Sequence, residues 1–363
     1  MDGLRGIAIL LVFMRHSVFG LETNVKPLAV FLKAGQLTWS GVDLFFVLSG
    51  FLIGGILLEA RNSPRYFKTF YIRRAYRIFP LYGIVTAAFL FRHLPFQLIH
   101  VVFGNSSPLT VPWFSYATLT QNLWMVPLGW FGPTAMTATW SLAVEEQFYL
   151  TIPLLIRRVG SRVLIAVLVT VIFAAPILRL ILHSQFRHGN FACYVLTPCR
   201  ADALCLGVLA AFLMRKQRFR DLLLSNRKSL CAVTFLFFLG VIYMTYAGWS
   251  PFAAPMNTFG YSWLALFYTG CLLLALASGP GRLQNLLSNR ILMGMGTIAY
   301  CSYLIHMPLI QAFRRILAHL NCRPAVSFLS GGLLGVGVTV VVAIISWKLF
   351  EKPLLRRGRV YMY

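Results

Sequence analysis

Long apolar segments recur along the whole chain, and they restrict its fold more than any other feature of the sequence. Apolar residues make up 58% of the 363 residues and charged residues 12%, about half the charged fraction of a soluble domain. Segments of about 17–25 apolar residues have the length needed to cross a hydrocarbon core of about 30 Å. We therefore predict an all-α, polytopic transmembrane helical bundle. Ten spans are expected, at residues 4–20, 39–58, 77–91, 138–156, 163–182, 201–214, 230–246, 259–277, 292–313 and 325–349.

The aromatic and Pro-rich segment 93–137 is expected to hold short re-entrant or interfacial helices, or an eleventh span. The last predicted span ends near the C-terminus, and the sequence has no evident internal repeat. One transmembrane domain at 1–363 is therefore expected, without an appended soluble domain. The seven Cys show no CxxC or CxxxH spacing, so no metal site is expected.

The distribution of Lys and Arg predicts the orientation of the bundle. Twenty of these residues fall in the second, fourth, sixth and eighth loops and the C-terminal tail, against seven in the loops of opposite parity. Because positively charged loops stay in the cytoplasm, both termini are expected on the cytoplasmic side of the cell (inner) membrane. The net charge of +24 then reflects loops beside membrane lipids, and no nucleic-acid partner is expected.

Ionisable side chains within the predicted spans are the candidate functional residues, because such groups usually face a cavity or a partner. At about 1.5 Å per residue, His16 lies about 18 Å from the inner face and Glu145 about 10 Å from the outer face. In a core of about 30 Å these depths agree within one helical turn. His306 reaches about 21 Å, and Asp43 lies about 6 Å from the outer face. The two histidines and one or both of these carboxylates are therefore expected to meet in the outer half of the bundle.

Arginines gather at the cytoplasmic ends of the first and third predicted spans. Arg5 lies eleven residues before His16 and on nearly the same helix face. Arg73, Arg74 and Arg77 begin the third span at i,i+3 and i,i+4 spacing, so one face can present two guanidinium groups. Since arginine forks bind phosphates, this pattern indicates a phosphate-bearing donor on the cytoplasmic side and a histidine base above it.

Each of these groups also has a structural interpretation. The arginines are equally suited to anchoring the bundle on anionic lipids, and His16 or a glutamate at 145–146 can be a buried structural residue. Asp43 and Asp202 lie near span ends, where helix capping is the simplest role. His306 precedes a proline, and the kink there frees a carbonyl for a local hydrogen bond.

Seven motifs in a fixed order carry a resemblance to a known family. They are MDGLRGIA from Met1, with His16 eleven residues after its arginine, GVDLFFVLSGFLIGGIL from Gly41, FYIRRAYRIFPLY from Phe70, TWSLAVEEQFYL from Thr139, RADALCLGVLAA from Arg200, YCSYLIHMPL from Tyr300 and LFEKPLLR from Leu349. With these motifs the chain resembles the acyltransferase 3 family, which includes bacterial polysaccharide and lipopolysaccharide O-acetyltransferases. The likeness extends over nearly the whole sequence.

The resemblance implies an acyl-CoA, usually acetyl-CoA, as the donor and a hydroxyl of a carbohydrate or glycolipid as the acceptor. It implies that Arg5 and His16 are an essential pair and that the Arg74-x-x-Arg77 motif belongs to the donor site. Together with Arg73, these arginines are expected to hold the CoA phosphates. His16 is then a general base or a transient acyl carrier.

The remaining assignments concern the groups around that histidine. Glu145 or Asp43 is expected to orient His16, as a carboxylate orients a catalytic imidazole. Glu146, His306 and Trp140 are assigned to acceptor binding. If the acyl group is relayed through a periplasmic hydrolase-like domain, the absence of one after the last predicted span makes that domain a separate protein. The alternative function is a transporter or flippase for a lipid-linked sugar, for which broken spans in symmetry-related halves would be evidence; no such halves are evident.

Overall fold

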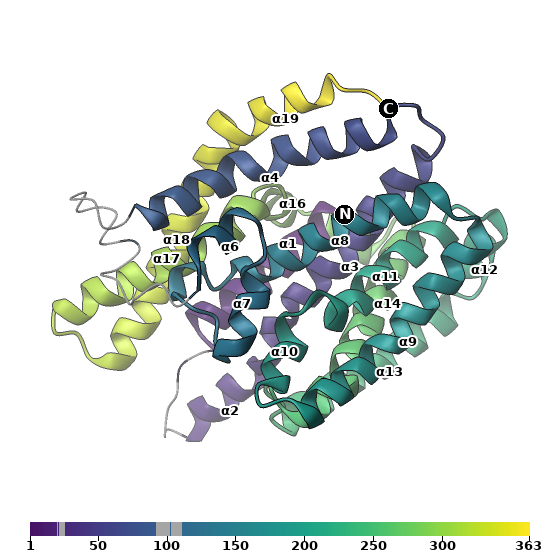
Figure 1. The fold of residues 1–363 in the computed structure, drawn as a ribbon. Coiled ribbons are helices and arrows are strands. Elements are labelled where there is room, and N and C mark those ends of the chain that lie inside the picture. The colour runs from purple at the N-terminus through teal and green to yellow at the C-terminus, as the bar shows by residue number, and fades with distance from the viewer. Residues whose placement is uncertain (20, 22–25, 92–101, 103–110) are drawn as a thin grey trace.

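The computed structural model describes residues 1–19, 21, 26–91, 102 and 111–363 and is all-helical in these parts (Figure 1). The long helices are α1 (Asp2–Ser17), α3 (Gly41–Glu59), α4 (Tyr66–Leu90), α8 (Thr139–Arg158), α9 (Ser161–Gln185), α11 (Thr197–Leu213), α13 (Arg227–Tyr246), α14 (Tyr261–Ala277), α17 (Ala299–His319) and α18 (Pro324–Ser346). The short ones are α2 (Lys26–Ala34), α6 (Trp113–Ala117), α7 (Gln121–Leu128), α10 (Gly189–Val195), α12 (Gln217–Ser225), α15 (Arg282–Leu287), α16 (Arg290–Thr297) and α19 (Lys352–Arg359). Single turns of 3-10 or π-helix are η1 (Gln36–Ser40), η2 (Thr134–Met136), η3 (Met256–Gly260) and η4 (Trp347–Glu351).

Six helical segments in the described part of the chain are long and apolar enough to cross a membrane. They are Ala29–Glu59, Ser161–Gln185, Gly189–Leu213, Arg227–Tyr246, Met256–Ala277 and Pro324–Arg359. The predicted all-helical membrane fold is therefore confirmed, but the predicted count of ten spans is not. The other four predicted spans lie in α1, α4, α8 and α17. Helix α1 is only 16 residues long, and ionisable side chains lower the mean hydropathy of the other three. These are also the helices that carry most of the candidate site residues.

Two further expectations about the spans differ from the structure. The predicted span 292–313 is interrupted, because α16 ends at Thr297 and α17 begins at Ala299. In the segment 93–137, residues 93–101 and 103–110 lie outside the described residues, and the expected eleventh span falls largely on them. From residue 113 to residue 136 the chain forms the short helices α6, α7 and η2, as expected for interfacial or re-entrant pieces.

Helix α1 lies at the centre of the arrangement, between two groups of helices (Figure 1). It contacts α3, α16, α17 and α18, and α3 in turn packs against α11 and α14. Glycine allows the closest of these approaches: a Cβ at Gly6 would overlap the backbone carbonyl of Leu292, and one at Gly50 would overlap that of Leu204. Small residues at such crossings bring helix backbones together in membrane proteins. The backbones of α1 and α16, and those of α3 and α11, are therefore in direct contact at these glycines.

Two buried ion pairs cross-link the helices on one side of α3. Asp43 accepts a hydrogen bond from Arg200 at 2.5 Å, and Asp202 accepts one from Arg179 at 3.0 Å. The expectation that Asp43 and Asp202 cap helices is wrong. Both carboxylates face guanidinium groups that are at most 1% exposed, and a buried cation requires such a partner.

The structure also shows which loops share an end of the bundle. Arg61 donates to the carbonyl of Val159, and Arg215 donates to the carbonyl of Gly55 at 2.5 Å. The loop that contains Arg215 leads, through α12, to the start of α13. At the other end of α13, Lys33 lies over the ring of Tyr246 at 5.5 Å. Loops that the charge distribution assigns to the same side of the membrane are therefore neighbours.

Candidate active site

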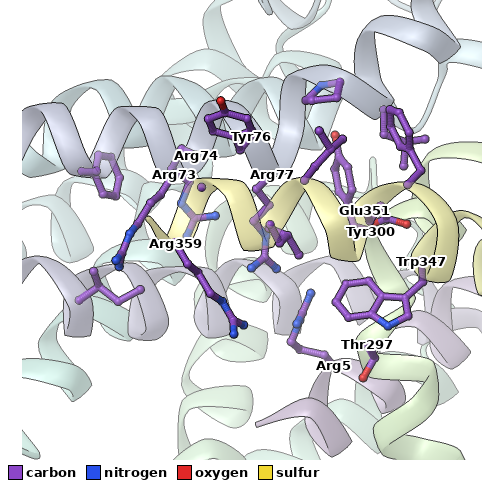
Figure 2. Close-up of a pocket in the computed structure, with 18 of the residues that line it drawn as sticks. Arg5, Arg73, Arg74, Tyr76, Arg77, Thr297, Tyr300, Trp347, Glu351 and Arg359 are labelled. Atoms are coloured by element: carbon purple, nitrogen blue, oxygen red, sulfur yellow. The ribbon is translucent and has the colours of Figure 1, made fainter. Parts of the chain in front are cut away.

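A polar cavity of about 470 Å³ lies between α1, α4, α17 and the C-terminal segment (Figure 2). Its charged lining consists of five arginines and two acids: Arg5, Arg73, Arg74, Arg77, Arg359, Asp2 and Glu351. Figure 2 shows the guanidinium groups of Arg5 and Arg77 pointing toward one another across the cavity. Two acids do not neutralise five guanidinium groups, so the cavity has the charge expected of a site for an anion.

Arg77 has the clearest free binding capacity in this cavity. Among the described residues, no hydrogen bond or ion pair engages its guanidinium group. Arg5 has only a long contact of 3.5 Å to Asp2, and Arg74 lies over the ring of Tyr149 at 4.7 Å. Arg77 is half-buried, and phosphate oxygens would fill the donors that its guanidinium group leaves open in the cavity.

Arg73 lines the same cavity but is partly engaged elsewhere. Its Nε donates to the carbonyl of Tyr361 at 2.8 Å, and its guanidinium lies over the ring of Tyr363 at 5.1 Å. The side chain of Tyr76 stacks on that of Tyr361 at 6.4 Å between ring centroids. Arg73 therefore holds the C-terminal segment beside α4, a contact that the sequence pattern did not predict.

The cavity includes residues that sequence reasoning missed. Arg359, Glu351, Trp347 and Tyr300 line it, and they come from the C-terminal segment and from the start of α17 (Figure 2). Helix α19 lies alongside α4 (Figure 1), and this brings Arg359 to the arginines of α4. The LFEKPLLR motif, with an acid and basic residues beside an apolar span, was the signal that pointed to this segment.

A second cavity of about 340 Å³ adjoins the first and shares Arg5, Arg74 and Arg77 with it. It extends between α1, α3, α8 and α17 and is lined mainly by apolar side chains of α3, together with Glu145 and Tyr303. The arginines therefore stand at the junction of a polar chamber and a mostly apolar one. This pairing suits a molecule with phosphates at one end and a less polar arm at the other.

Glu145 lies in the second cavity, close to the arginines. Its carboxylate accepts a hydrogen bond from the hydroxyl of Tyr149 at 3.3 Å, and that hydroxyl also bonds to Ser49. Glu146 faces elsewhere: it lines neither of the two cavities, and its buried Oε1 has no hydrogen-bond partner among the described residues. The adjacent glutamates thus have different surroundings, as expected for neighbours on a helix.

Two histidines form a pair beside Tyr303, a residue that lines the second cavity. The Nε2 atom of His306 lies 3.3 Å from the Nδ1 atom of His16, and His306 is fully buried. Tyr303 lies between this pair and the cavity: its ring is 5.7 Å from that of His306, and its hydroxyl bonds to Ser141 at 2.6 Å. Arg314 donates to the backbone carbonyl of His16 at 2.6 Å. The end of α1 is thereby held against α17.

The expected carboxylate partners of His16 are not beside it. Asp43 is paired with Arg200 and Glu145 with Tyr149, and no hydrogen bond in the described part of the chain joins either acid to His16. Instead, His306 contacts His16. The estimate from helix depth did not include the direction in which each side chain points, and the helices turn these acids toward other cations and donors.

Trp140 is placed in a packed aromatic cluster. It is 3% exposed, and its ring lies 4.5 Å from that of Tyr194 and 6.1 Å from that of Phe46. It lines neither cavity. Its surroundings are those of a core residue, and the assignment to acceptor binding has no contact in the structure that supports it.

Metal ligands are not clustered in the described part of the chain. No group of three His, Cys, Asp or Glu side chains there has the arrangement needed to hold a metal ion.

The family of the protein follows from its match to known proteins. Residues 1–348 match the acyltransferase 3 family, which is described as an acyltransferase domain, and the chain belongs to this family. YrhL of Bacillus subtilis, provisionally named a peptidoglycan O-acetyltransferase, is 29% identical over 99% of this chain and 55% of its own length. The peptidoglycan O-acetyltransferase OatA of Listeria monocytogenes is 26% identical over 98% of this chain and 56% of its own length.

The chain thus spans little more than half the length of the curated relatives it matches. The O-acetyltransferase OatA of Staphylococcus aureus shows the same relation, with 26% identity over 99% of this chain and 57% of its own. No solved structure matches the chain.

Proposed function

We propose that this protein is a membrane O-acetyltransferase that moves an acetyl group from cytoplasmic acetyl-CoA to a hydroxyl of a cell-envelope carbohydrate. The observation that carries the proposal is the junction of the two cavities at Arg5, Arg74 and Arg77. Acetyl-CoA has phosphates at one end and a long, less charged arm that ends in the thioester. The phosphates match the arginine-lined chamber, and the arm matches the adjoining apolar one.

The proposed reaction centres on His16. Its neutral imidazole takes the proton of the acceptor hydroxyl, and the oxygen attacks the thioester carbonyl. A carbon–oxygen bond forms, the carbon–sulfur bond breaks, and the imidazolium returns the proton to the departing thiolate to give CoA–SH. In the alternative, covalent route, an imidazole nitrogen of His16 first attacks the thioester and releases CoA–SH, and the acceptor hydroxyl then takes the acetyl group from the acyl-histidine as the carbon–nitrogen bond breaks. For the thioester to reach His16, the Tyr303–Ser141 contact has to open, since it lies between the cavity and the histidine pair.

For the acceptor, we propose a glycan of the cell envelope, with peptidoglycan as the first to test. The support is the names of the relatives, two of which are named for peptidoglycan O-acetylation. These relatives are longer than this chain, so a further domain or a separate periplasmic protein belongs to the proposal as the partner that completes delivery.

The activity can be tested with the detergent-purified protein and acetyl-CoA alone or with glycan fragments. We expect slow release of CoA–SH without acceptor and faster release with it, with acetyl appearing on the glycan by mass spectrometry. A lipid-linked sugar transporter would release no CoA–SH under either condition. That result would overturn the proposed enzyme.

The donor site gives a quantitative prediction for Arg77→Ala. Because no hydrogen bond or ion pair from the described residues engages this guanidinium, removing it should leave folding nearly unchanged while weakening acetyl-CoA binding. A lost charge-assisted bond to phosphate corresponds to about 10- to 100-fold in affinity. Calorimetric titration of the purified variant with acetyl-CoA measures it.

Arg356→Ala is the matched control for that measurement, because Arg356 is an exposed arginine of α19 that does not line the cavity. Its donor affinity should equal that of the wild type. Equal affinities for the two variants would leave membrane-lipid anchoring as the role of Arg77.

Topology is the third test, since the site must open to the side that holds CoA. We propose that both termini and the loop at Lys216 are cytoplasmic and that the loop at Ser250 is outside. Ser250 is chosen because neighbouring Gly248 has φ +70°, which a cysteine would strain. In a background with Cys231 and Cys322 replaced by Ser, a membrane-impermeant thiol reagent should label Ser250→Cys in intact cells. Labelling of Lys216→Cys instead would invert the arrangement.

A further inference from the structure

The two histidines differ in the hydrogen-bond partners that surround their ring nitrogens, and those partners determine where the protons lie. The Nδ1 atom of His306 lies 2.7 Å from the carbonyl oxygen of Tyr303. A carbonyl can only accept, so this nitrogen carries the proton. A neutral imidazole has one N–H, which leaves the Nε2 atom of His306 as an acceptor.

The same reasoning applies to His16. Its Nδ1 atom lies 3.0 Å from the carbonyl oxygen of Val12 and 3.3 Å from the Nε2 atom of His306. Both neighbours accept, so Nδ1 of His16 must carry the proton and share it between them. The Nε2 atom of His16 is then without a proton, and no hydrogen bond in the described part of the chain occupies it.

We propose that His306 is a positioning residue for His16: it holds the tautomer in which Nε2 of His16 is the base, and it stabilises the imidazolium after proton transfer. This inference rests on the proposed function for its catalytic meaning. It replaces the assignment of His306 to acceptor binding. A second neutral imidazole here occupies the place that a carboxylate takes in other catalytic imidazole arrangements.

The surroundings of the pair fit this role. His306 is fully buried and is held by its own helix through Tyr303, while Phe13 packs against it at 5.9 Å between ring centroids. Arg314 fixes the backbone of His16 from α17 through the His16 carbonyl. A carboxylate in the place of His306 would add a negative charge to the interior and would pair with a cation such as Arg314. The neutral imidazole of His306 accepts a hydrogen bond from His16 without adding a charge.

The tautomer can be tested without any activity measurement. In protein labelled with ¹⁵N-histidine, His16 signals are assigned by their loss in His16→Gln. We expect the wild type to show His16 with a protonated Nδ1 and a bare Nε2, the reverse of the tautomer favoured by free imidazole side chains. A His16 protonated only at Nε2 would overturn the inference, whether or not the protein transfers acetyl groups.

Kinetics supply the second readout. His306→Phe removes one of the two acceptors of the His16 Nδ1 proton and should lower kcat for transfer by about 10- to 100-fold, with KM for acetyl-CoA unchanged because the arginine cavity is untouched. His306→Gln places an amide oxygen where Nε2 stood and should recover most of that loss. His319→Phe, an exposed histidine at the end of the same helix, is the control and should retain the wild-type rate.

Wild-type kcat in His306→Phe would contradict the positioning role, as would a His306→Gln variant no better than His306→Phe. If His306→Phe does not fold, the rate of His306→Gln relative to the wild type still tests the role of His306, and the wild-type spectrum still tests the tautomer of His16. If the wild type transfers no acetyl group, only the proposed function is contradicted, because the tautomer of His16 is measured without any activity assay.

Discussion

Replacing His16 by Gln should lower acetyl transfer by about 10²–10⁴-fold, the usual contribution of a general base, while the protein folds and binds acetyl-CoA normally. Glutamine keeps a hydrogen-bonding group of similar length but cannot accept a proton from a hydroxyl. The arginine cavity is formed by other residues, so donor affinity should be unaffected. CoA–SH release per folded molecule and calorimetric titration with acetyl-CoA measure the two quantities separately.

His16→Ala and His319→Gln complete this experiment. A purely structural His16 predicts that Gln is tolerated and that Ala is unstable, with activity per folded molecule retained in both. A catalytic His16 predicts that both variants fold and both are inactive. His319→Gln should behave as the wild type, because this side chain is exposed at the end of α17. Wild-type turnover by His16→Gln would show that the catalytic assignment is wrong.

Replacing Arg179 by Met should destabilise the protein by about 3–5 kcal/mol, the usual cost of leaving one partner of a buried ion pair alone. Arg179 is fully buried and donates to Asp202 at 3.0 Å, to the carbonyl of Asn257 at 3.1 Å and to the hydroxyl of Ser262 at 2.6 Å. Met fills a similar volume, so the loss is chiefly electrostatic. The shift is measured by unfolding of the purified protein in detergent.

The double variant Arg179→Met/Asp202→Leu separates the pair from the packing around it. Removing both charges leaves no uncompensated carboxylate, so the double variant should be clearly more stable than Arg179→Met alone. Arg187→Met, at an exposed arginine just after α9, controls for the loss of a positive charge and should not change the stability. A double variant as unstable as the single one would refute the coupling.

Local features of the sequence were sufficient to predict the helices and the family. The lengths of the apolar segments were sufficient to locate the long helices. A helix that crosses or borders a membrane needs consecutive apolar residues whatever its neighbours are. The arginines of α4 were predicted to share a site with Arg5, and the structure brings Arg5, Arg74 and Arg77 to one cavity. Hydropathy was least informative for α1, α4, α8 and α17, where the candidate site residues interrupt the apolar pattern.

Only the tertiary structure decided which side chains meet. Helix rise gives depth in the membrane from sequence, but the direction of a side chain and the identity of its neighbour depend on how helices cross. His16 and His306 are 290 residues apart, and Asp43 and Arg200 are 157 apart. At similar depth His16 was expected to face a carboxylate, and it faces an imidazole because Asp43 and Glu145 are turned toward a cation and a tyrosine. The sequence therefore determined the membrane-helical fold and the family, whereas helix packing determined the partner of His16.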